Sequence, residues 1–170
     1  LKDDSVWDCL ESALDTALKG VITMRTNEGR ELKGYMQKQI VNIRGLIDRI
    51  EERAPLVVLE YKTRLEERIQ ELLGGDLEIE QERFNSEVAF FADRSDITEE
   101  VIRFRSHIKQ FSDSLELKDA IGRRLDFIVQ EMNREINTIG SKASDLDICN
   151  YVVDVKSELE KIREQIQNIE

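Results

Sequence analysis

Apolar residues separated by steps of three and four recur along almost the whole 170-residue chain, and this spacing constrains the fold more than any other feature. It places the apolar side chains along one face of an α-helix. No segment alternates apolar and polar residues with a period of two, and no turn pair indicates a β-hairpin. The sequence therefore predicts an all-α protein.

The first apolar stripe should end at Ala54–Pro55, because proline disfavours helix at the residue that precedes it. The next stripe stops at Gly74–Gly75 and predicts a helix that returns along the first. We therefore expect a long antiparallel helical hairpin, a coiled-coil-like arm, over residues 1–75. A compact helical bundle should follow over residues 76–170.

Three further stripes predict the main helices of this bundle, over residues 97–115, 121–139 and 148–169. Thr98, which two acids follow, is expected to cap the first of these helices. Gly140–Ser141 should interrupt the second.

Charge and composition limit the classes of function. The formal net charge of −11 argues against a nucleic-acid partner, because phosphate binding usually leaves a basic footprint. Residues 103–142, however, carry eight basic and six acidic side chains, a local basic excess. Apolar runs are too short for a transmembrane helix, so no membrane partner is expected. Cys9 and Cys149 have no metal-ligand spacing, and buried reduced thiols in a cytoplasmic protein are expected.

The segment 130–142 differs from an ordinary helix exterior. Asn and Thr are poor helix formers, because their side chains compete for the backbone. Carboxylate, amide and guanidinium groups are dense here, on Gln130, Glu131, Asn133, Arg134, Glu135, Asn137 and Thr138. They could hold a divalent cation, a phosphate or each other. A polar network that fixes helix register is the alternative.

A second polar row, Glu99, Arg103, His107 and Gln110, lies beside an apolar face. Such a ladder is often a solvated row of ion pairs. The functional interpretation is that His107 transfers a proton while Arg103 and Arg105 bind phosphate. No P-loop, nucleophile elbow, zinc motif or dinucleotide-binding turn is present.

Several strings resemble the C-terminal region of the YicC family, over nearly the whole chain. The most specific is the one from Glu131 to Lys142. The others lie in the following ranges: Met24–Leu32, Ile50–Leu65, Glu87–Glu100, Arg103–Phe111, Gly122–Gln130 and Lys156–Glu170.

This resemblance implies a metal-dependent endoribonuclease that forms a ring-like homo-oligomer, such as a hexamer. Family members are bacterial, cytoplasmic and stress-associated. The resemblance implies that full-length members also carry an N-terminal α+β domain before this region, and we expect the given sequence not to include it.

The leading hypothesis is thus an RNA-cleaving nuclease. Glu131 and Glu135 would be ligands of Mg²⁺ or Mn²⁺, because hard cations prefer oxygen ligands. His107 would be a general acid or base. The residues expected to bind RNA are Arg103, Arg105, Arg123, Arg124, Arg134 and Lys142. A polar network would comprise Glu99, Gln130, Asn133, Asn137 and Thr138, with the two asparagines as ligands or orienting groups. The alternative is a non-catalytic oligomerisation or adaptor module that recruits RNA or another nuclease.

Overall fold

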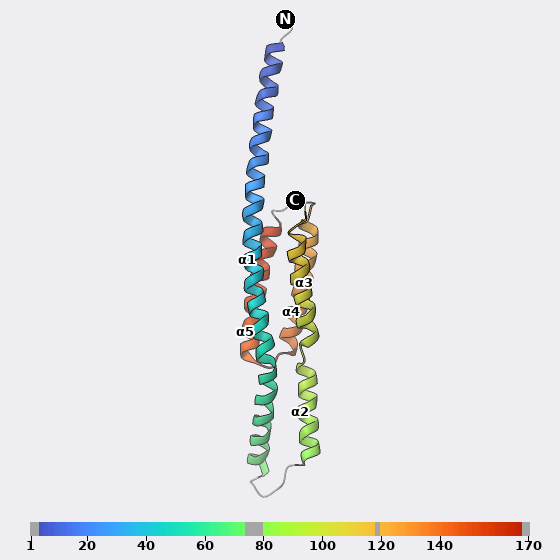
Figure 1. Cartoon of the computed structure of the whole chain (residues 1–170). Coiled ribbons are helices and arrows are strands. Elements are labelled where there is room, and N and C mark those ends of the chain that lie inside the picture. Colours follow the sequence, from blue (N-terminus) through green and yellow to red (C-terminus); the bar gives the residue numbers. More distant parts are fainter. Residues whose placement is uncertain (1–3, 74–79, 118–119, 168–170) are drawn as a thin grey trace. The chain divides into compact units, whose positions relative to one another are not determined.

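The computed structural model describes residues 4–73, 80–117 and 120–167, without the side chains of Asp4, Ser5 and Leu73. Within them the regular structure consists of helices only (Figure 1): α1 (Asp4–Leu73), α2 (Gln81–Ser95), α3 (Thr98–Ser114), α4 (Gly122–Lys142) and α5 (Leu146–Ile166). The all-α prediction, with a long first helix followed by packed helices, is therefore confirmed. The chain divides into two compact units, residues 1–38 and 39–170.

Residues 1–38 contribute the first part of α1. Large apolar side chains are exposed along it, including those of Trp7, Leu10, Leu14, Val21 and Met24. With Ala17 included, the series from Leu10 to Met24 advances by alternating steps of four and three residues. This is the spacing of a coiled-coil stripe. Cys9 is also exposed, so its predicted burial is wrong, whereas Cys149 is half-buried; neither forms a disulfide.

Residues 39–170 form a core between the following part of α1 and helices α3, α4 and α5. Ile43, Ile47 and Ile50 of α1 are fully buried. The other helices contribute Phe104 and Phe111 (α3), Leu125, Met132, Ile136 and Ile139 (α4), and Val155, Leu159 and Ile162 (α5), each without exposed surface. Helix α4 packs against both α3 and α5. This packing fixes which faces of α3 and α4 remain open to solvent.

The predicted helix end at Ala54–Pro55 is wrong, because α1 continues through Pro55 to Leu73. Proline in a helix interior removes one backbone hydrogen bond and costs about 3 kcal/mol. Contacts on both sides of the proline stabilise the continuation. Arg53 donates to both carboxylate oxygens of Glu60, at 2.6 and 2.8 Å, and so joins the two turns across it.

An antiparallel pair does form, but between the last part of α1 and α2, which run in opposite directions (Figure 1). The rings of Tyr61 and Phe91 stack with centroids 3.7 Å apart, and the Tyr61 hydroxyl donates to Glu87 at 3.3 Å. The reversal predicted at Ala54–Pro55 is not seen, and Gly74–Gly75, where the returning helix was predicted to stop, lies outside the described residues. The expected domain division at residue 75 stays a prediction.

Two local details differ from expectation. The cap residue of α3 is Ile97 rather than Thr98, and its side chain makes no cap bond. Oδ1 of the preceding Asp96 accepts from the backbone N–H of Thr98 at 2.9 Å. Helix α4 continues through Gly140 to Lys142. A Cβ atom at Gly140 would lie 3.2 Å from Cγ1 of Val152, so the glycine allows α5 to pack closely.

Among the residues that the structure describes, none of the helices has both the length and the apolar character needed to cross a lipid bilayer.

Candidate functional site

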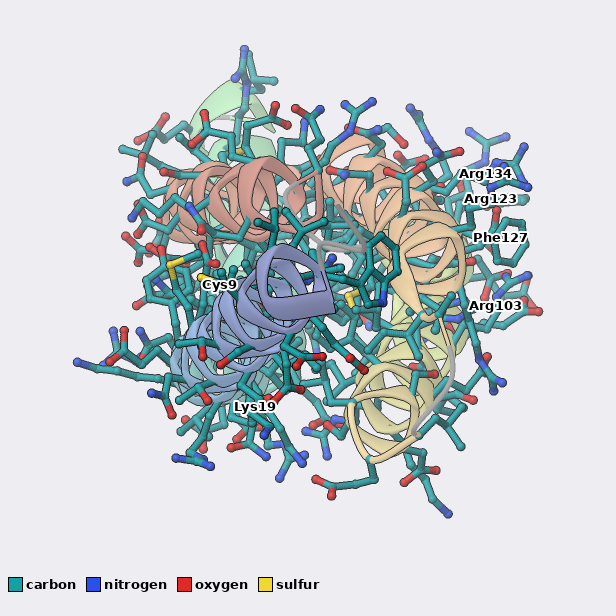
Figure 2. All side chains as sticks on the ribbon, turned by 90° about the horizontal axis from the view of Figure 1, so that it is seen from above. Cys9, Lys19, Arg103, Arg123, Phe127 and Arg134 are labelled. Carbon is teal, nitrogen blue, oxygen red and sulfur yellow. The ribbon has the colours of Figure 1, made fainter. Side chains whose placement is uncertain are left out.

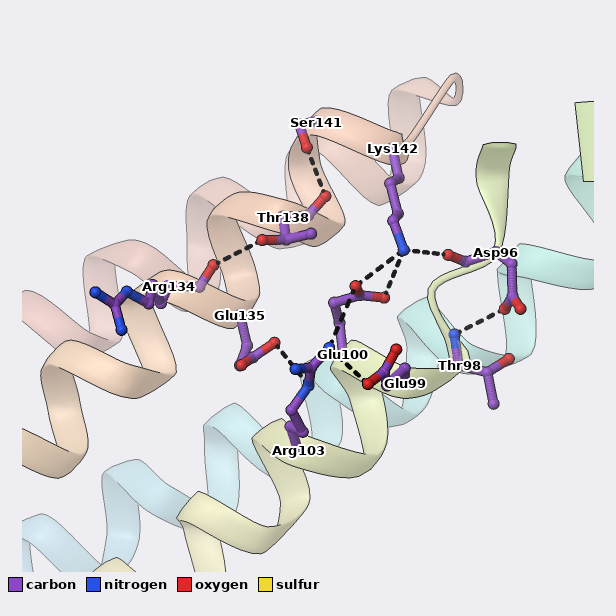
Figure 3. Close-up of polar contacts among 10 residues, drawn as sticks. All are labelled: Asp96, Thr98, Glu99, Glu100, Arg103, Arg134, Glu135, Thr138, Ser141 and Lys142. Carbon is purple, nitrogen blue, oxygen red and sulfur yellow. Dashed lines mark hydrogen bonds and ion pairs between the residues drawn. The ribbon is translucent and has the colours of Figure 1, made fainter. Parts of the chain in front are cut away.

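A charged cluster lies where the start of α3 meets the end of α4 (Figure 3). Glu100 projects from α3 into the packed interior, where only 5% of its side chain is exposed. The Lys142 ammonium group donates to its two carboxylate oxygens at 2.9 and 3.0 Å and to the backbone carbonyl of Asp96 at 2.8 Å. These three bonds use all three donors of the lysine. The pair therefore ties α4 to both α3 and the turn before it.

Arg103 lies at the solvent side of this cluster. Its Nη2 group is 3.0 Å from Glu99 and 3.8 Å from Glu100, and its Nε group is 3.6 Å from Oε2 of Glu135 on α4. About half of the arginine side chain is exposed, whereas Glu135 is almost buried. The structure thus brings two predicted site residues from different helices, Arg103 and Glu135, into one ion pair (Figure 3).

One helical turn before Glu135, Glu131 accepts a hydrogen bond at 3.2 Å from Arg134, which is 78% exposed. Each of the two predicted metal-binding carboxylates is therefore paired with an arginine. The structure contains no group of three or more His, Cys, Asp or Glu side chains that could hold a metal ion, as far as its described residues extend. A divalent ion bound by Glu131 and Glu135 would need its other oxygen ligands from phosphate or water, as Mg²⁺ often does.

His107 is half-buried on α3, one turn after Arg103. Within the described part of the chain, no hydrogen bond or ion pair joins it to Glu131 or Glu135. The predicted acid or base thus lies one turn of α3 from Arg103 and is not joined to the two carboxylates by a hydrogen bond or ion pair in the described residues.

The predicted polar network is only partly assembled. Gln130 donates to Asp126 at 2.7 Å, and Thr138 donates to the backbone of Arg134 at 3.2 Å. Asn133 is half-buried and Asn137 is exposed. These side chains follow the surface of α4 rather than converge on one point.

The predicted RNA-binding residues fall into two groups. Lys142 is engaged with Glu100, and Arg105 pairs with Asp48 and Glu51 of α1. These two cations join helices together. The others, Arg103, Arg123, Arg124 and Arg134, are exposed on α3 and α4.

Sequence reasoning missed Glu100, because an acid in the first turn of a helix is usually a solvated charge. It also missed a second cluster in which Arg53 bonds both Glu60 and Asp145. The Nη2 group of Arg53 is 2.7 Å from Oδ2 of Asp145. Asp145 also caps α5 by accepting from the N–H of Ile148 at 3.0 Å. Because Asp145 stands just before an apolar stripe, its role as the N-cap of α5 could have been predicted from the sequence.

Arg53 alters the acidity of both of its partners. Its hydrogen bond is the main cause of a lowered pKa for the Asp145 carboxyl, with burial acting in the opposite direction and the Ile148 N–H adding to the effect. The pKa of Glu60 is lowered for the same primary reason. Both acids are therefore held in the charged state, and the cluster is an inter-helix brace.

Comparison with known proteins shows which family the chain belongs to. Residues 50–170 match the family model described as "Endoribonuclease YicC-like, C-terminal". The chain is 48% identical over 168 residues to a "Probable endoribonuclease YicC" of Clostridioides difficile (strain 630), covering 99% of this chain and 57% of that protein. It is 35% identical over 167 residues to a protein of the same description from Haemophilus influenzae, covering 98% and 57%. The chain spans just over half the length of these curated relatives. It belongs to the YicC-like endoribonuclease family and contains the family's C-terminal region.

Proposed function

We propose that this chain is the RNA-cleaving helical part of an endoribonuclease. Two curated relatives are described as probable endoribonucleases. The observation in this chain that supports the proposal most is the pairing of Arg103 with Glu135 across α3 and α4, beside the Arg134–Glu131 pair. Carboxylates that can hold a metal ion and exposed guanidinium groups that can neutralise phosphoryl charge suit phosphodiester hydrolysis.

The arginines would bind the phosphate. A guanidinium group has five N–H donors that suit phosphate geometry. The contacts of Arg103 use its Nε and Nη2 groups, and that of Arg134 uses Nη1. Further donors on each arginine are thus left for a phosphate that approaches from solvent. Such contacts neutralise the charge that develops on the phosphoryl oxygens in the transition state.

Glu131 and Glu135 would hold Mg²⁺ or Mn²⁺, because their hard carboxylate oxygens suit these ions. When bound, the ion would neutralise phosphoryl charge and make a water more acidic. In the hydrolysis, the water oxygen bonds to phosphorus while one P–O ester bond breaks, and the leaving oxygen takes up a proton. His107 is the group proposed to move that proton.

The test is cleavage of an end-labelled RNA with Mg²⁺ or Mn²⁺ present, with and without a chelator. We expect cleavage that the chelator abolishes. Glu131→Gln and Glu135→Gln should each lower the rate at least about a hundredfold, equivalent to about 3 kcal/mol in the barrier. Glu82→Gln, at an exposed acid on α2, is the matched control and should cleave normally. Cleavage that survives both site substitutions would remove these carboxylates from the mechanism, and chelator-resistant cleavage would remove the metal.

A second proposal, homo-oligomerisation, is supported by the exposed apolar side chains of residues 6–24. Stripes of this length are seldom left in water, and their spacing suits a helix from a second copy. It also fits the alternative function, an adaptor that assembles and recruits RNA or another nuclease without cleaving it.

Sedimentation at micromolar concentration tests this second proposal. We expect an oligomer, and Leu14→Glu should shift it toward monomer. Ser12→Glu, an equal charge change on the other side of the helix, should not. A monomeric parent chain would refute the proposal. The cytoplasmic location expected from the family stays a prediction.

A further inference from the structure

Phe127 occupies an unusual position on α4. Its side chain is 62% exposed. Leu125, Ile128 and Met132 of the same helix are buried in the core. Phe127 is therefore on the outer face of α4, where packing gives no reason for an aromatic ring. It is the only aromatic side chain with an exposed majority among the described residues of α3, α4 and α5.

Arginines surround this ring on the same face. Arg123 precedes Phe127 by four residues and Arg134 follows it by seven, and both spacings keep a side chain on one side of a helix. Figure 2, seen along the helices, shows Arg123, Phe127 and Arg134 directed outward together, with Arg103 on the same side. The nearby acids are already engaged: Asp126 accepts from Gln130, and Glu131 accepts from Arg134.

We propose that Phe127 is a stacking platform for a base of unpaired RNA. This inference rests on the proposed ribonuclease function and specifies its substrate class. The ring would stack on one base, while Arg123 and Arg134 bind phosphates on either side. Base stacking on an aromatic side chain combined with a basic surface is the general mode of single-strand recognition.

The spacing along α4 connects this platform to the carboxylates. At 1.5 Å per residue, Arg123 lies about 6 Å and Arg134 about 10 Å from Phe127 along the helix axis. Glu131 is one turn from the ring and Glu135 two turns. A nucleotide held on Phe127 would thus lie close in sequence to the phosphate that Arg103 and Arg134 bind. The ring would position the strand beside the site of cleavage.

This geometry favours unpaired RNA over duplex RNA. In a duplex the base faces are covered by neighbouring base pairs, so an exposed ring has no base to stack on. The arginines alone would still attract a duplex through its phosphates. Phe127 should therefore affect the preference between the two forms more than the overall attraction to nucleic acid.

The test uses the whole chain, a fluorescently labelled single-stranded RNA of about twelve nucleotides, and a duplex of the same sequence. Phe127→Leu keeps the apolar character but removes the ring. We expect it to weaken single-strand binding by about five- to a hundredfold, the range for loss of one stacked base, with duplex binding changed less than twofold. Phe127→Trp should restore binding. Phe90→Leu, at an equally exposed ring on α2 (67%), is the control and should bind like the parent chain.

The outcomes separate this inference from the proposed function. If the parent chain cleaves or binds RNA and Phe127→Leu binds single strands equally well, the platform is refuted and the ribonuclease proposal stands. Equal losses for single strand and duplex would also refute it. If Phe127→Leu changes the sedimentation coefficient instead of RNA affinity, the ring belongs to a protein interface. If the parent chain neither binds nor cleaves RNA, both proposals fail.

Discussion

Replacing Lys142 by methionine tests whether this lysine stabilises the fold rather than binds substrate. The substitution leaves the Glu100 carboxylate inside the protein, and among the described residues its remaining cationic partner is Arg103, at 3.8 Å. It also removes a bond to the carbonyl of Asp96. Breaking a buried ion pair from one side costs about 3–5 kcal/mol.

The expected loss is smaller than that full range, because one third of the Lys142 side chain is exposed and solvent therefore screens the ion pair in part. We expect the free energy of unfolding to fall by roughly 2–3 kcal/mol. In a chain of this size, that corresponds to a decrease in Tm of roughly 4–12 °C.

The measurement is urea unfolding followed by circular dichroism, in a double-mutant cycle with Glu100→Gln. Glutamine keeps a similar shape but has no charge to leave unpaired. In that background Lys142→Met should cost about 1 kcal/mol or less, the range of an ordinary hydrogen bond. Lys109→Met, at an exposed lysine of α3, is the control and should change stability by less than about 0.5 kcal/mol. Equal losses in both backgrounds, or no loss in the parent chain, would refute the buried-pair reasoning.

Other predictions concern how α5 is held. Asp145→Ala should lower stability by about 1 kcal/mol or more through loss of the α5 cap. Asp145→Asn should keep the cap and lose less stability. Thermal melts compare the two variants, and the reverse order would contradict the capping role. Because Arg53 lowers the pKa of Asp145 in the folded state, the stability from this pair is present above about pH 4 and is lost as pH falls through the lowered pKa. Arg53→Met should therefore make acid unfolding less steep below pH 4, as urea titrations at several pH values can show. Gly140→Leu should cost about 1–3 kcal/mol by overpacking against Val152, and Val152→Ala should recover part of that loss in the same melts.

Much of the fold could be predicted from local spacing, because the apolar stripe of each helix is a property of its own residues. The stripes through Phe104 and Met132 became buried faces as expected. Pro55 was misjudged because its local preference is weaker than contacts from distant residues. The bonds of Arg53 to Glu60 and Asp145 involve residues 7 and 92 positions away, which spacing does not reveal.

The candidate site was predictable as a set of residues but not as a set of partners. The composition of α4 indicated that Glu131, Arg134 and Glu135 were unusual, and all three lie on this helix, with Glu135 almost buried. Arg134 and Glu131 pair within α4, whereas the pairing of Arg103 with Glu135 depends on how α3 crosses α4. The same packing determines that Lys142 contacts a buried carboxylate, while Arg103 keeps half of its side chain in solvent.

Because α1 continues through Pro55, the side chains before and after the proline have a fixed angular relation about the helix axis. Ile50, in the core, and Tyr61, which stacks on Phe91, belong to the same uninterrupted helix. Each residue added between them would rotate one contact about 100° relative to the other, because an α-helix has 3.6 residues per turn. Single insertions or deletions there would misalign one of the two contacts, whereas an insertion of seven residues, close to two turns, would nearly restore the alignment. This stretch of α1 should therefore tolerate substitution far better than any change in length.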